Sequence, residues 1–383
     1  MKKICVITGS RAEYGLLSRL MRLIKKEDDL QLQVIATNMH LSPEFGLTYK
    51  EIEADGFTID RKVHMLLSSD TANATTKSVG LGTIGFADAF EDLKPDMIVV
   101  LGDRYEILAA VSAALFYKIP VAHLHGGEIT EGAYDDAIRH AITKMSHLHF
   151  TSTEDYRQRV IQMGEQPSNV HYVGALGCDN IRHIPLMAKE ELEQSMNFAL
   201  DKNTLLVTFH PVTMENATTE KQFRELLAAF DDFKDLRFIF TMPNSDTDGR
   251  IIINMIKEYV ERNASRSVYF TSLGMKRYLS ALQYIGGVIG NSSSGIIEAP
   301  SFHIPTINIG DRQKGRIAAT SVLHCLPEKN DIKEKISIIC QPAYAESLKA
   351  VQNPYDKPDT AEAIVRILKE QKIESVKKFH NLT

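Results

Sequence analysis

The stretch MIVVLGDRYEILAAVSAALFYKIPVAHLHGGE, residues 97–128, joins two short apolar runs through a segment of helical period. The runs occupy residues 97–101 and 121–124, and the segment between them spans residues 105–116. Continuous β-branched runs of this length are typical of strands buried on both faces of a sheet. Two such strands joined by a helix predict a β-α-β unit with parallel strands and a right-handed crossover.

The same alternation of strand and helix recurs on both sides of this stretch. Further apolar runs of strand length lie at residues 4–8, 32–37, 148–151, 170–173, 205–209, 238–241, 287–290 and 306–309. We therefore predict an α/β fold with two doubly wound, Rossmann-like domains, at residues 1–175 and 176–360, and an active site in the cleft between them. A last helix near residues 360–371 is expected to pack back onto the first domain, within a C-terminal segment at residues 361–383.

The bulk composition limits the classes of partner. The chain has 383 residues, of which 44% are hydrophobic and 24% are charged, and its formal net charge is -5. This balance gives no general attraction to nucleic acid or to an anionic membrane. An anionic small molecule must therefore be held by a few locally placed basic groups.

The four cysteines, Cys5, Cys178, Cys325 and Cys340, lie far apart and form no CxxC pair. This pattern is typical of free thiols in a reducing compartment and argues against a structural zinc site. The N-terminal residues lack the features of a signal peptide, and no apolar run reaches the ~18 residues that a membrane-spanning helix needs. We expect a cytoplasmic protein.

Polar residues follow the predicted strands at the positions where open parallel sheets bind ligands, beyond the carboxyl ends of the strands. These strand-end segments are residues 9–13, 102–104, 125–128, 210–213, 243–246, 290–295 and 310–313. We expect them to meet at one site.

The segment GNSSSG, residues 290–295, combines small residues with hydroxyls and precedes a predicted helix that contains Glu298. Backbone N–H groups and hydroxyls of such a segment can approach an anion, and a diphosphate would suit it. One alternative is a simple serine N-cap. A serine-hydrolase elbow fits less well, because Asn291 stands where that motif has its first glycine.

Arg11, His210 and Arg312 are candidates for the remaining phosphate contacts. A guanidinium grips phosphate oxygens in two places, and a histidine donates one directional bond. Glu298 is a candidate for the ribose hydroxyls, which need an acceptor with two oxygens. The simpler interpretations are surface or capping roles for the basic residues and a solvent-facing helix carboxylate for Glu298.

Four carboxylates, Asp103, Glu128, Asp135 and Asp136, belong to the strand-end segments of the first half or follow them closely. Paired carboxylates suit bond cleavage at an anomeric carbon, where one group transfers a proton and another stabilises developing positive charge. A simpler interpretation of Asp136 is an intrahelical pair with basic residues three and four positions later. For Asp103 it is a local ion pair with Arg104.

Two other patterns are discounted. Residues 80–85, GLGTIG, match the letters of a dinucleotide-binding motif, but no apolar strand precedes them. His123, His125, His147 and His149 alternate as strand residues do and lack the spacing of a metal motif, so we predict neither a metal nor a cofactor.

Together the strand-end motifs resemble one family, the hydrolysing UDP-N-acetylglucosamine 2-epimerases of sialic and related nonulosonic acid biosynthesis. The resemblance is carried by GSRAEY (9–14), MH (39–40), GDR (102–104), GGE (126–128), DDAIRHAITK (135–144), HPVT (210–213), GNSS (290–293) and NIGDRQ (308–313). These motifs occur in order across both predicted domains, and their combination is far more specific than any one of them.

The resemblance implies the two-domain fold of many nucleotide-sugar glycosyltransferases. It also implies a reaction in which UDP is eliminated before water adds with inversion at C2, giving UDP and an N-acetylmannosamine-type sugar. Carried over by position, it implies diphosphate contacts from Arg11, His210, Ser292, Ser293 and Arg312, a ribose contact from Glu298, and sugar contacts from Asp103, Glu128 and Asp135. We also expect substrate contacts from His40, Arg104 and Asn244, and a homodimer or homotetramer.

One position departs from the family pattern. Many relatives carry a glutamate where this chain has His125, three residues before Glu128. The part of that glutamate in proton transfer falls either to His125 or to Glu128, so both are candidate catalytic residues with Asp103 and Asp135.

Other functions share this architecture. A non-hydrolysing epimerase keeps UDP on its product, a glycosyltransferase needs an acceptor, and a silent UDP-sugar sensor has no use for the four carboxylates. The motifs also leave open whether the substrate is UDP-N-acetylglucosamine or UDP-N,N'-diacetylbacillosamine, because contacts to C4 and C6 of the sugar cannot be read from them.

Overall fold

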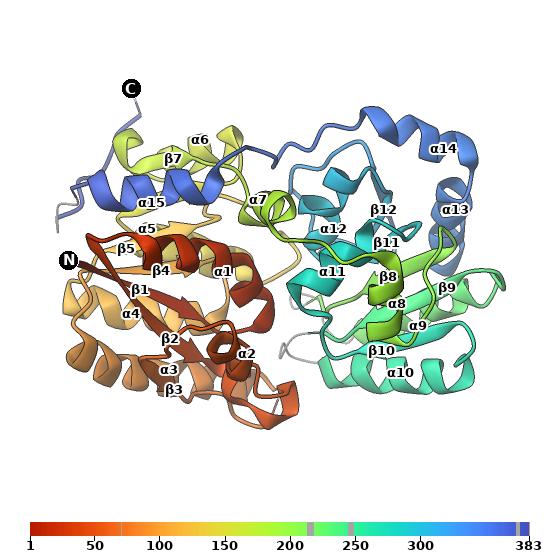
Figure 1. The fold of residues 1–383 in the computed structure, drawn as a ribbon, viewed down its shortest axis with the longest axis horizontal. Helices are drawn as coiled ribbons and strands as arrows, with labels where there is room; N and C mark the ends of the chain where they lie inside the picture. The colour runs from red at the N-terminus through yellow and green to blue at the C-terminus, as the bar shows by residue number, and fades with distance from the viewer. Residues whose placement is uncertain (70, 213–217, 244–248, 373–375, 383) are drawn as a thin grey trace. The chain divides into compact units, whose positions relative to one another are not determined.

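The computed structural model describes residues 1–69, 71–212, 218–243, 249–372 and 376–382. The chain forms two compact units, which we call the first and second domains (Figure 1). The first comprises Met1–Glu128, Asp135–Asn180 and Lys357–Thr383, and the second comprises Ile129–Tyr134 and Ile181–Asp356. Across the described ranges, no helix is both long and apolar enough to cross a membrane.

The first domain is built on a seven-stranded parallel sheet with the order β3-β2-β1-β4-β5-β6-β7. Its strands are β1 (Lys2–Thr8), β2 (Leu30–Thr37), β3 (Arg61–Val63), β4 (Met97–Leu101), β5 (Val121–Leu124), β6 (Leu148–Thr151) and β7 (Val170–Tyr172). The strand order reverses between β1 and β4, which is the switch point where sheets of this class bind ligands.

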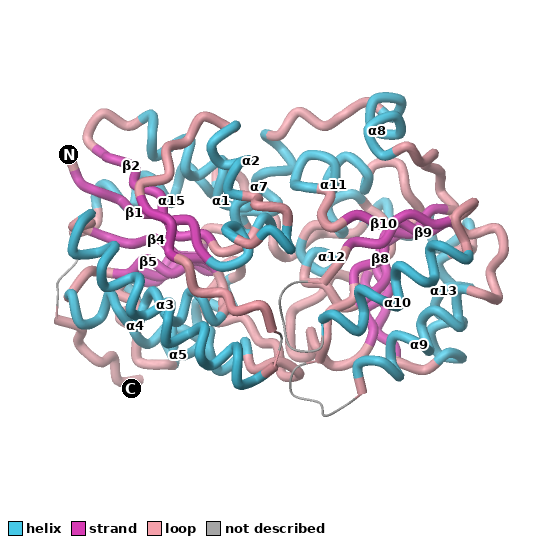
Figure 2. The backbone as a smooth tube through the Cα atoms, turned by 90° about the horizontal axis from the view of Figure 1, so that it is seen from below, coloured by secondary structure: helices cyan, strands magenta, loops and turns pink. Residues whose placement is uncertain are grey.

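Helices cover both faces of this sheet. The helices of this domain are α1 (Arg11–Lys26), α2 (Tyr49–Ala54), α3 (Ala72–Leu93), α4 (Tyr105–Tyr117), α5 (Asp135–Met145), α6 (Glu154–Gln162) and α15 (Thr360–Glu370). The helix α7 (Leu176–His183) begins in the first domain and ends in the second. Helices α1 and α15 lie on one face, and α3, α4 and α5 lie on the other (Figure 2). The helix α15 belongs to the core of the first domain, because Ile364 and Leu368 are buried in one cluster with Leu17 and Leu20.

The second domain repeats this plan with a six-stranded parallel sheet of order β10-β9-β8-β11-β12-β13. Its strands are β8 (Thr204–Thr208), β9 (Arg237–Thr241), β10 (Ser267–Phe270), β11 (Gly287–Gly290), β12 (Thr306–Ile309) and β13 (Val322–Cys325). Its helices are α8 (Lys189–Met196), α9 (Thr219–Phe230), α10 (Gly249–Arg262), α11 (Gly274–Leu282), α12 (Ser294–Ile297), α13 (Lys329–Ile339) and α14 (Pro342–Ser347). Here the order reverses between β8 and β11.

The two parallel sheets confirm the predicted fold class. The GLGTIG letters of residues 80–85 fall inside α3, whereas a dinucleotide motif requires a turn between a strand and a helix. Two of its glycines serve packing instead. A Cβ added at Gly82 or at Gly85 would lie 2.8 Å from the side chain of Met65 or of Val63, respectively, so small residues let α3 approach its neighbours.

Candidate functional site

The turn after β1 is fixed by a capping box at the start of α1. The Ser10 hydroxyl accepts the N–H of Glu13 at 3.3 Å, and Oε2 of the Glu13 carboxyl group accepts the N–H groups of Gly9 (2.7 Å) and Ser10 (3.1 Å). This arrangement places Arg11 at the first position of the helix. The Arg11 side chain is partly exposed, and its Nε lies 2.7 Å from Oε2 of Glu51.

His40, a predicted substrate contact, lies beneath this turn and is fully buried. Its Nε2 is 3.0 Å from the Thr8 hydroxyl and its Nδ1 is 2.8 Å from the Thr48 hydroxyl. Burial lowers the pKa of His40 to about 4, so the ring is neutral near pH 7. Both ring nitrogens are therefore used inside the first domain, where they support the turn after β1.

Two charged residues that follow β4, Asp103 and Arg104, bind different partners. Gly102 adopts a positive φ of 77° and turns the chain out of the strand. Asp103 then forms an ion pair with Arg139 of α5, rather than with its neighbour Arg104. Arg104 is buried, and its Nε lies 2.8 Å from Oε1 of Glu106.

Arg139 is the residue that joins the acidic set, although its sequence position alone carries no such signal. It is 1% exposed. Besides Asp103, its guanidinium binds the backbone carbonyl of Glu128 at 3.0 Å and lies 3.4 Å from a carboxylate oxygen of Asp136. Asp136 also lies 3.5 Å from His140, so the intrahelical pairs suggested as its simpler interpretation are present.

The loop after β5 is tightly confined. His125 has a φ of +65°, in the left-handed region that non-glycine residues seldom adopt. Gly126 passes close to α5, since an added Cβ would lie 3.0 Å from the Thr143 hydroxyl. Gly127 has a φ of +79°, and its Cβ would lie 2.5 Å from the Tyr156 carbonyl oxygen. Strained, over-determined backbone of this kind is concentrated at functional sites.

This loop pairs His125 with Glu128. The Nδ1 atom of His125 lies 2.9 Å from Oε1 of Glu128, a carboxylate that is almost fully buried. The Ser152 hydroxyl donates to the same oxygen at 2.7 Å. The other ring nitrogen, Nε2, is buried and has no hydrogen-bond partner within the described residues. An imidazole with one nitrogen held by a carboxylate and the other unengaged is suited to proton transfer.

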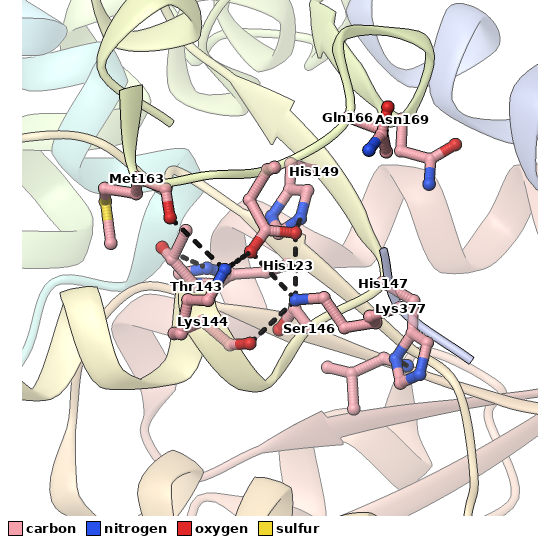
Figure 3. Close-up of polar contacts among 12 residues, drawn as sticks. His123, Thr143, Lys144, Ser146, His147, His149, Met163, Gln166, Asn169 and Lys377 are labelled. Atoms are coloured by element: carbon pink, nitrogen blue, oxygen red, sulfur yellow. Dashed lines mark hydrogen bonds and ion pairs between the residues drawn. The ribbon is translucent and has the colours of Figure 1, made fainter. Parts of the chain in front are cut away.

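Helix α5 is connected by hydrogen bonds to the ends of β4 and β5. Asp135 begins the helix and is 8% exposed. Farther along, the Thr143 hydroxyl lies 3.1 Å from Nδ1 of His123, whose Nε2 lies 2.7 Å from the carbonyl oxygen of Gly102 (Figure 3). Burial lowers the pKa of His123 to about 3. A neutral histidine therefore connects α5 to the residue that precedes Asp103.

The C-terminal end of α5 is anchored by an ion cluster around the buried Glu165 (Figure 3). Glu165 accepts Nζ of Lys144 at 2.8 Å and also lies 2.8 Å from Nζ of Lys377 and 3.0 Å from Nε2 of His149. Burial raises the pKa of the Glu165 carboxyl, but hydrogen bonds and charges from His149, Lys144 and Lys377 outweigh it and lower the pKa to about 2. Lys377 also donates to the carbonyl of Lys144 at 2.7 Å, so the chain beyond α15 takes part in this anchor.

In the second domain, one amide organises the ends of β8 and β11. Asn291 is fully buried. Its side chain accepts the N–H of His210 at 2.7 Å and donates to the carbonyl of His210 at 2.8 Å. Its backbone carbonyl accepts from Arg312 at 3.1 Å and from Gln313 at 3.0 Å. Asn291 thus brings His210 and Arg312, two predicted phosphate contacts, to one place.

The serine segment follows directly. Gly290 must be glycine, because its φ is +138° and an added Cβ would lie 1.9 Å from the Thr208 carbonyl oxygen. Ser292 and Ser293 then lead into α12, and the Ser292 hydroxyl accepts the N–H of Ser294 at 3.4 Å. Both predicted diphosphate serines therefore stand at the start of a helix.

The helix itself is shorter than predicted. It ends before Glu298, and a 3-10 turn, η4 (Ala299–Phe302), follows. Pro300 explains the early end, because proline has no N–H to continue an α-helix. Glu298 is 6% exposed, so the interpretation of a solvent-facing carboxylate is wrong.

Two further findings concern the predicted site residues. Asn244 lies outside the described residues. Within the ranges that are described, no group of three or more His, Cys, Asp or Glu side chains is placed to hold a metal ion. Ser152 was not predicted, although it directly follows β6 and the rule applied to the other strand ends could have found it.

Comparison with known proteins identifies the family. The family model described as UDP-N-acetylglucosamine 2-epimerase matches residues 22–369. The chain is 46% identical to the GDP/UDP-N,N'-diacetylbacillosamine 2-epimerase (hydrolyzing) of Campylobacter jejuni, over 87% of this chain and 86% of that protein. It is 41% identical to the polysialic acid biosynthesis protein P7 of Escherichia coli, over 97% and 94% of the two chains.

A solved structure shows the same fold. The UDP-GlcNAc 2-epimerase from Neisseria meningitidis, bound to UDP-GlcNAc, superimposes with a TM-score of 0.80 at 19% identity, over 97% of this chain and all of that one. This likeness at 19% identity shows the fold alone, whereas the matched family model and the relatives above 40% identity show the family. This chain belongs to the UDP-N-acetylglucosamine 2-epimerase family.

Proposed function

We propose that the chain is a hydrolysing UDP-sugar 2-epimerase that releases UDP and a 2-epimerised sugar for nonulosonic acid biosynthesis. We place UDP-N,N'-diacetylbacillosamine first among its substrates. Two relatives, at 46% and 38% identity, carry this sugar nucleotide in their names, and the second of them comes from Legionella pneumophila. UDP-N-acetylglucosamine is the second candidate, as the name of a relative at 32% identity suggests.

The observation that carries the proposal is the buried pair of His125 and Glu128. With its Nδ1 on the carboxylate, His125 presents Nε2 as a base. In the first step this nitrogen takes the C2 proton while the C1–O bond breaks and its electron pair leaves with UDP. A C1–C2 double bond forms, and the sugar becomes a glycal.

The second step is the addition of water and a proton to the C1–C2 double bond. A water oxygen adds to C1 and that water gives up one proton to the solvent, while C2 receives a proton from a protonated acid on the face opposite to the one that lost its proton. Asp135, at the start of α5, is our candidate for returning this proton. Asp103, held by Arg139, supplies negative charge for the positive charge that develops at C1.

We assign the UDP moiety to the second domain. His210 and Arg312 are held together by Asn291, and Ser292 and Ser293 directly precede α12. Guanidinium, imidazole, hydroxyl and backbone N–H groups are donors that suit a diphosphate, and Glu298 offers acceptors to a ribose.

The remaining predicted contacts play smaller parts in the proposal. Arg11 joins the diphosphate contacts by exchanging Glu51 for phosphate. Arg104 and Asn244 stay candidate substrate contacts. His40 acts indirectly, by supporting the turn from which Arg11 projects.

Proton NMR in heavy water tests the function directly. The protein is incubated separately with UDP-N,N'-diacetylbacillosamine, its GDP counterpart and UDP-N-acetylglucosamine, and nucleotide release and the sugar product are followed together. We expect free UDP and a 2-epimer that carries deuterium at C2. A product that keeps its UDP would indicate a non-hydrolysing epimerase, and unchanged spectra would favour a transferase or a sensor.

We also propose a cytoplasmic location and a homodimer or homotetramer. Free cysteines support the first, since Cys5, Cys178 and Cys325 are buried as unpaired thiols. Cell fractionation tests the location. Light scattering on the eluting protein tests the assembly, and a monomer would overturn that part.

A further inference from the structure

We propose that Ser152 is a positioning residue of the proton-transfer pair, which it serves by fixing the acceptor oxygen of Glu128. The inference rests on the proposed function. It adds a third member to the pair, so that the hydroxyl of Ser152 and the Nδ1–H of His125 both donate to Oε1 of Glu128.

The hydroxyl of Ser152 has a different kind of hydrogen-bond partner from the hydroxyls of its two neighbours. Thr151, Ser152 and Thr153 form a run of three buried hydroxyl residues at the end of β6. The Thr151 hydroxyl donates to backbone carbonyls, and the Thr153 hydroxyl caps α6 by accepting the N–H of Tyr156 at 3.3 Å. These are ordinary local roles for threonine. Ser152 instead reaches across to the loop after β5, 24 residues away along the chain.

The shared oxygen explains what Ser152 does. Glu128 is buried and its Oε1 accepts from two donors, at 2.7 Å and 2.9 Å. Two donors on one oxygen restrict rotation of the carboxylate, and an ionised carboxylate oxygen has no proton to donate, so it can only accept from the imidazole. Nδ1 of His125 must then carry the ring proton. Nε2 is left without one, which is the tautomer that a base requires.

The alternative is that Ser152 merely fills space with a satisfied hydroxyl. Ser146 supplies a matched comparison, because it is equally buried and its hydroxyl donates to the carbonyl of Ile142 at 2.7 Å (Figure 3). Removing either hydroxyl deletes one buried hydrogen bond near β6. Of these two serines, only Ser152 contacts the proton-transfer pair.

The experiment compares Ser152→Ala, Ser146→Ala and Ser152→Thr in the full-length protein. We expect kcat for UDP release to fall about ten-fold in Ser152→Ala, with KM unchanged, because a hydrogen bond to a charged group is lost. Ser146→Ala should keep the wild-type kcat. Ser152→Thr restores the hydroxyl and should recover most of the activity. Thermal unfolding checks that each variant is folded.

A second measurement does not depend on turnover. Nitrogen NMR of protein labelled in its histidines reports the tautomer of each ring, and a His125→Asn spectrum assigns the His125 signals. We expect the Nδ1–H tautomer in the wild type and in Ser146→Ala, and a mixture in Ser152→Ala.

The outcomes are distinguishable. Wild-type kcat in Ser152→Ala, or an equal loss in both alanine variants, would overturn the role of Ser152. If the wild type releases no nucleotide, the proposed function fails, and the tautomer spectra alone decide whether Ser152 orients His125. An unchanged tautomer in Ser152→Ala overturns the inference in that case as well.

Discussion

The six strands of the second sheet follow the same order as the first six of the first sheet, but different kinds of side chain occupy the strand ends of the two domains. At the reversal point of the first domain and beside it, ionisable side chains are paired with one another, as Asp103 is with Arg139 and His125 with Glu128. At the reversal point of the second, a single neutral amide, Asn291, binds backbone groups and positions its neighbours.

The difference follows from what each end has to do. A proton-transfer group needs a defined protonation state and orientation, and buried charged partners impose both. An anion site needs donors that remain available to the ligand, so a scaffold of backbone bonds that spares hydroxyls and N–H groups is better suited. The same architecture therefore supports two kinds of chemistry through the partners chosen at its strand ends.

The largest effect is expected at His125. We predict that His125→Asn lowers kcat about 1000-fold with little change in KM, since general acid–base catalysis contributes about 10²- to 10⁴-fold. Asparagine tolerates a positive φ, so this change removes the imidazole without adding backbone strain. Steady-state UDP release measures it, with the exposed His183→Asn as the control. A kcat within ten-fold of the wild type would remove His125 from the chemistry.

A substitution of Arg139 tests how much the buried pairing of Asp103 with Arg139 stabilises the first domain. Arg139→Met leaves Asp103 without its cation, and we expect a loss of about 3–5 kcal/mol in the free energy of unfolding. Urea unfolding gives the value. Arg182→Met is the control, because Arg182 and Asp356 form an exposed pair whose loss should change stability by about 1 kcal/mol or less. Equal losses in the two variants would show that burial of Arg139 does not matter.

Asn291 tests the second domain. Asn291→Ala removes two hydrogen bonds to the backbone of His210, each worth about 1 kcal/mol. We expect UDP affinity, measured by calorimetry, to fall about 30-fold. His125→Asn should bind UDP as the wild type does. If His125→Asn weakened UDP binding as much as Asn291→Ala, the division of labour between the domains would be lost.

The smallest effect, counted per pH unit, is a dependence of stability on pH that originates in the first domain. The pKa of His40 is about 4 and that of His123 about 3, both below the ordinary histidine value, because burial disfavours the charged ring. Their contribution is complete above about pH 6.5, where unfolded histidine titrates, and is lost as the pH falls toward 4. Each adds a slope of about 1.4 kcal/mol per pH unit in that window.

Glu13 acts in the opposite sense. Burial and the nearby Glu106 raise its pKa to about 8, so its contribution is present below about pH 4.5 and is lost as the pH rises toward 8. Glu13→Gln keeps the capping box and removes this opposing contribution. Urea unfolding between pH 6.5 and 4.5 should then show a steeper pH dependence than in the wild type, by about 1.4 kcal/mol per unit. Parallel curves would contradict the assignment.

The sequence predicted the central strands better than the edges. The runs at residues 97–101 and 121–124 coincide with β4 and β5, because strands buried on both faces are apolar throughout. Of the four edge strands, β7 was predicted at residues 170–173, but β3, β10 and β13 were not. In β3, Arg61 and Lys62 are exposed and only Val63 is buried, so no apolar run marks it.

The sequence predicted which residues belong to the candidate site, but it did not predict which of them contact one another. Strand-end position was enough to select Asp103, Glu128 and the serines. It could not show that Asp103 turns to Arg139, 36 residues away, instead of to the adjacent Arg104. That choice depends on the turn at Gly102 and on where the neighbouring loop brings α5, and neither can be read from spacing.

The return of α15 to the first domain also bears on how the chain is made. Its apolar side chains complete the core around Leu17 and Leu20, and they are synthesised after all of Ile181–Asp356. While the ribosome is still extending the chain, the second domain can acquire every residue that it needs before the first domain does. The first domain can therefore complete its core only after α15 has been made, and until then the apolar side chains of α1 that α15 buries lack this cover.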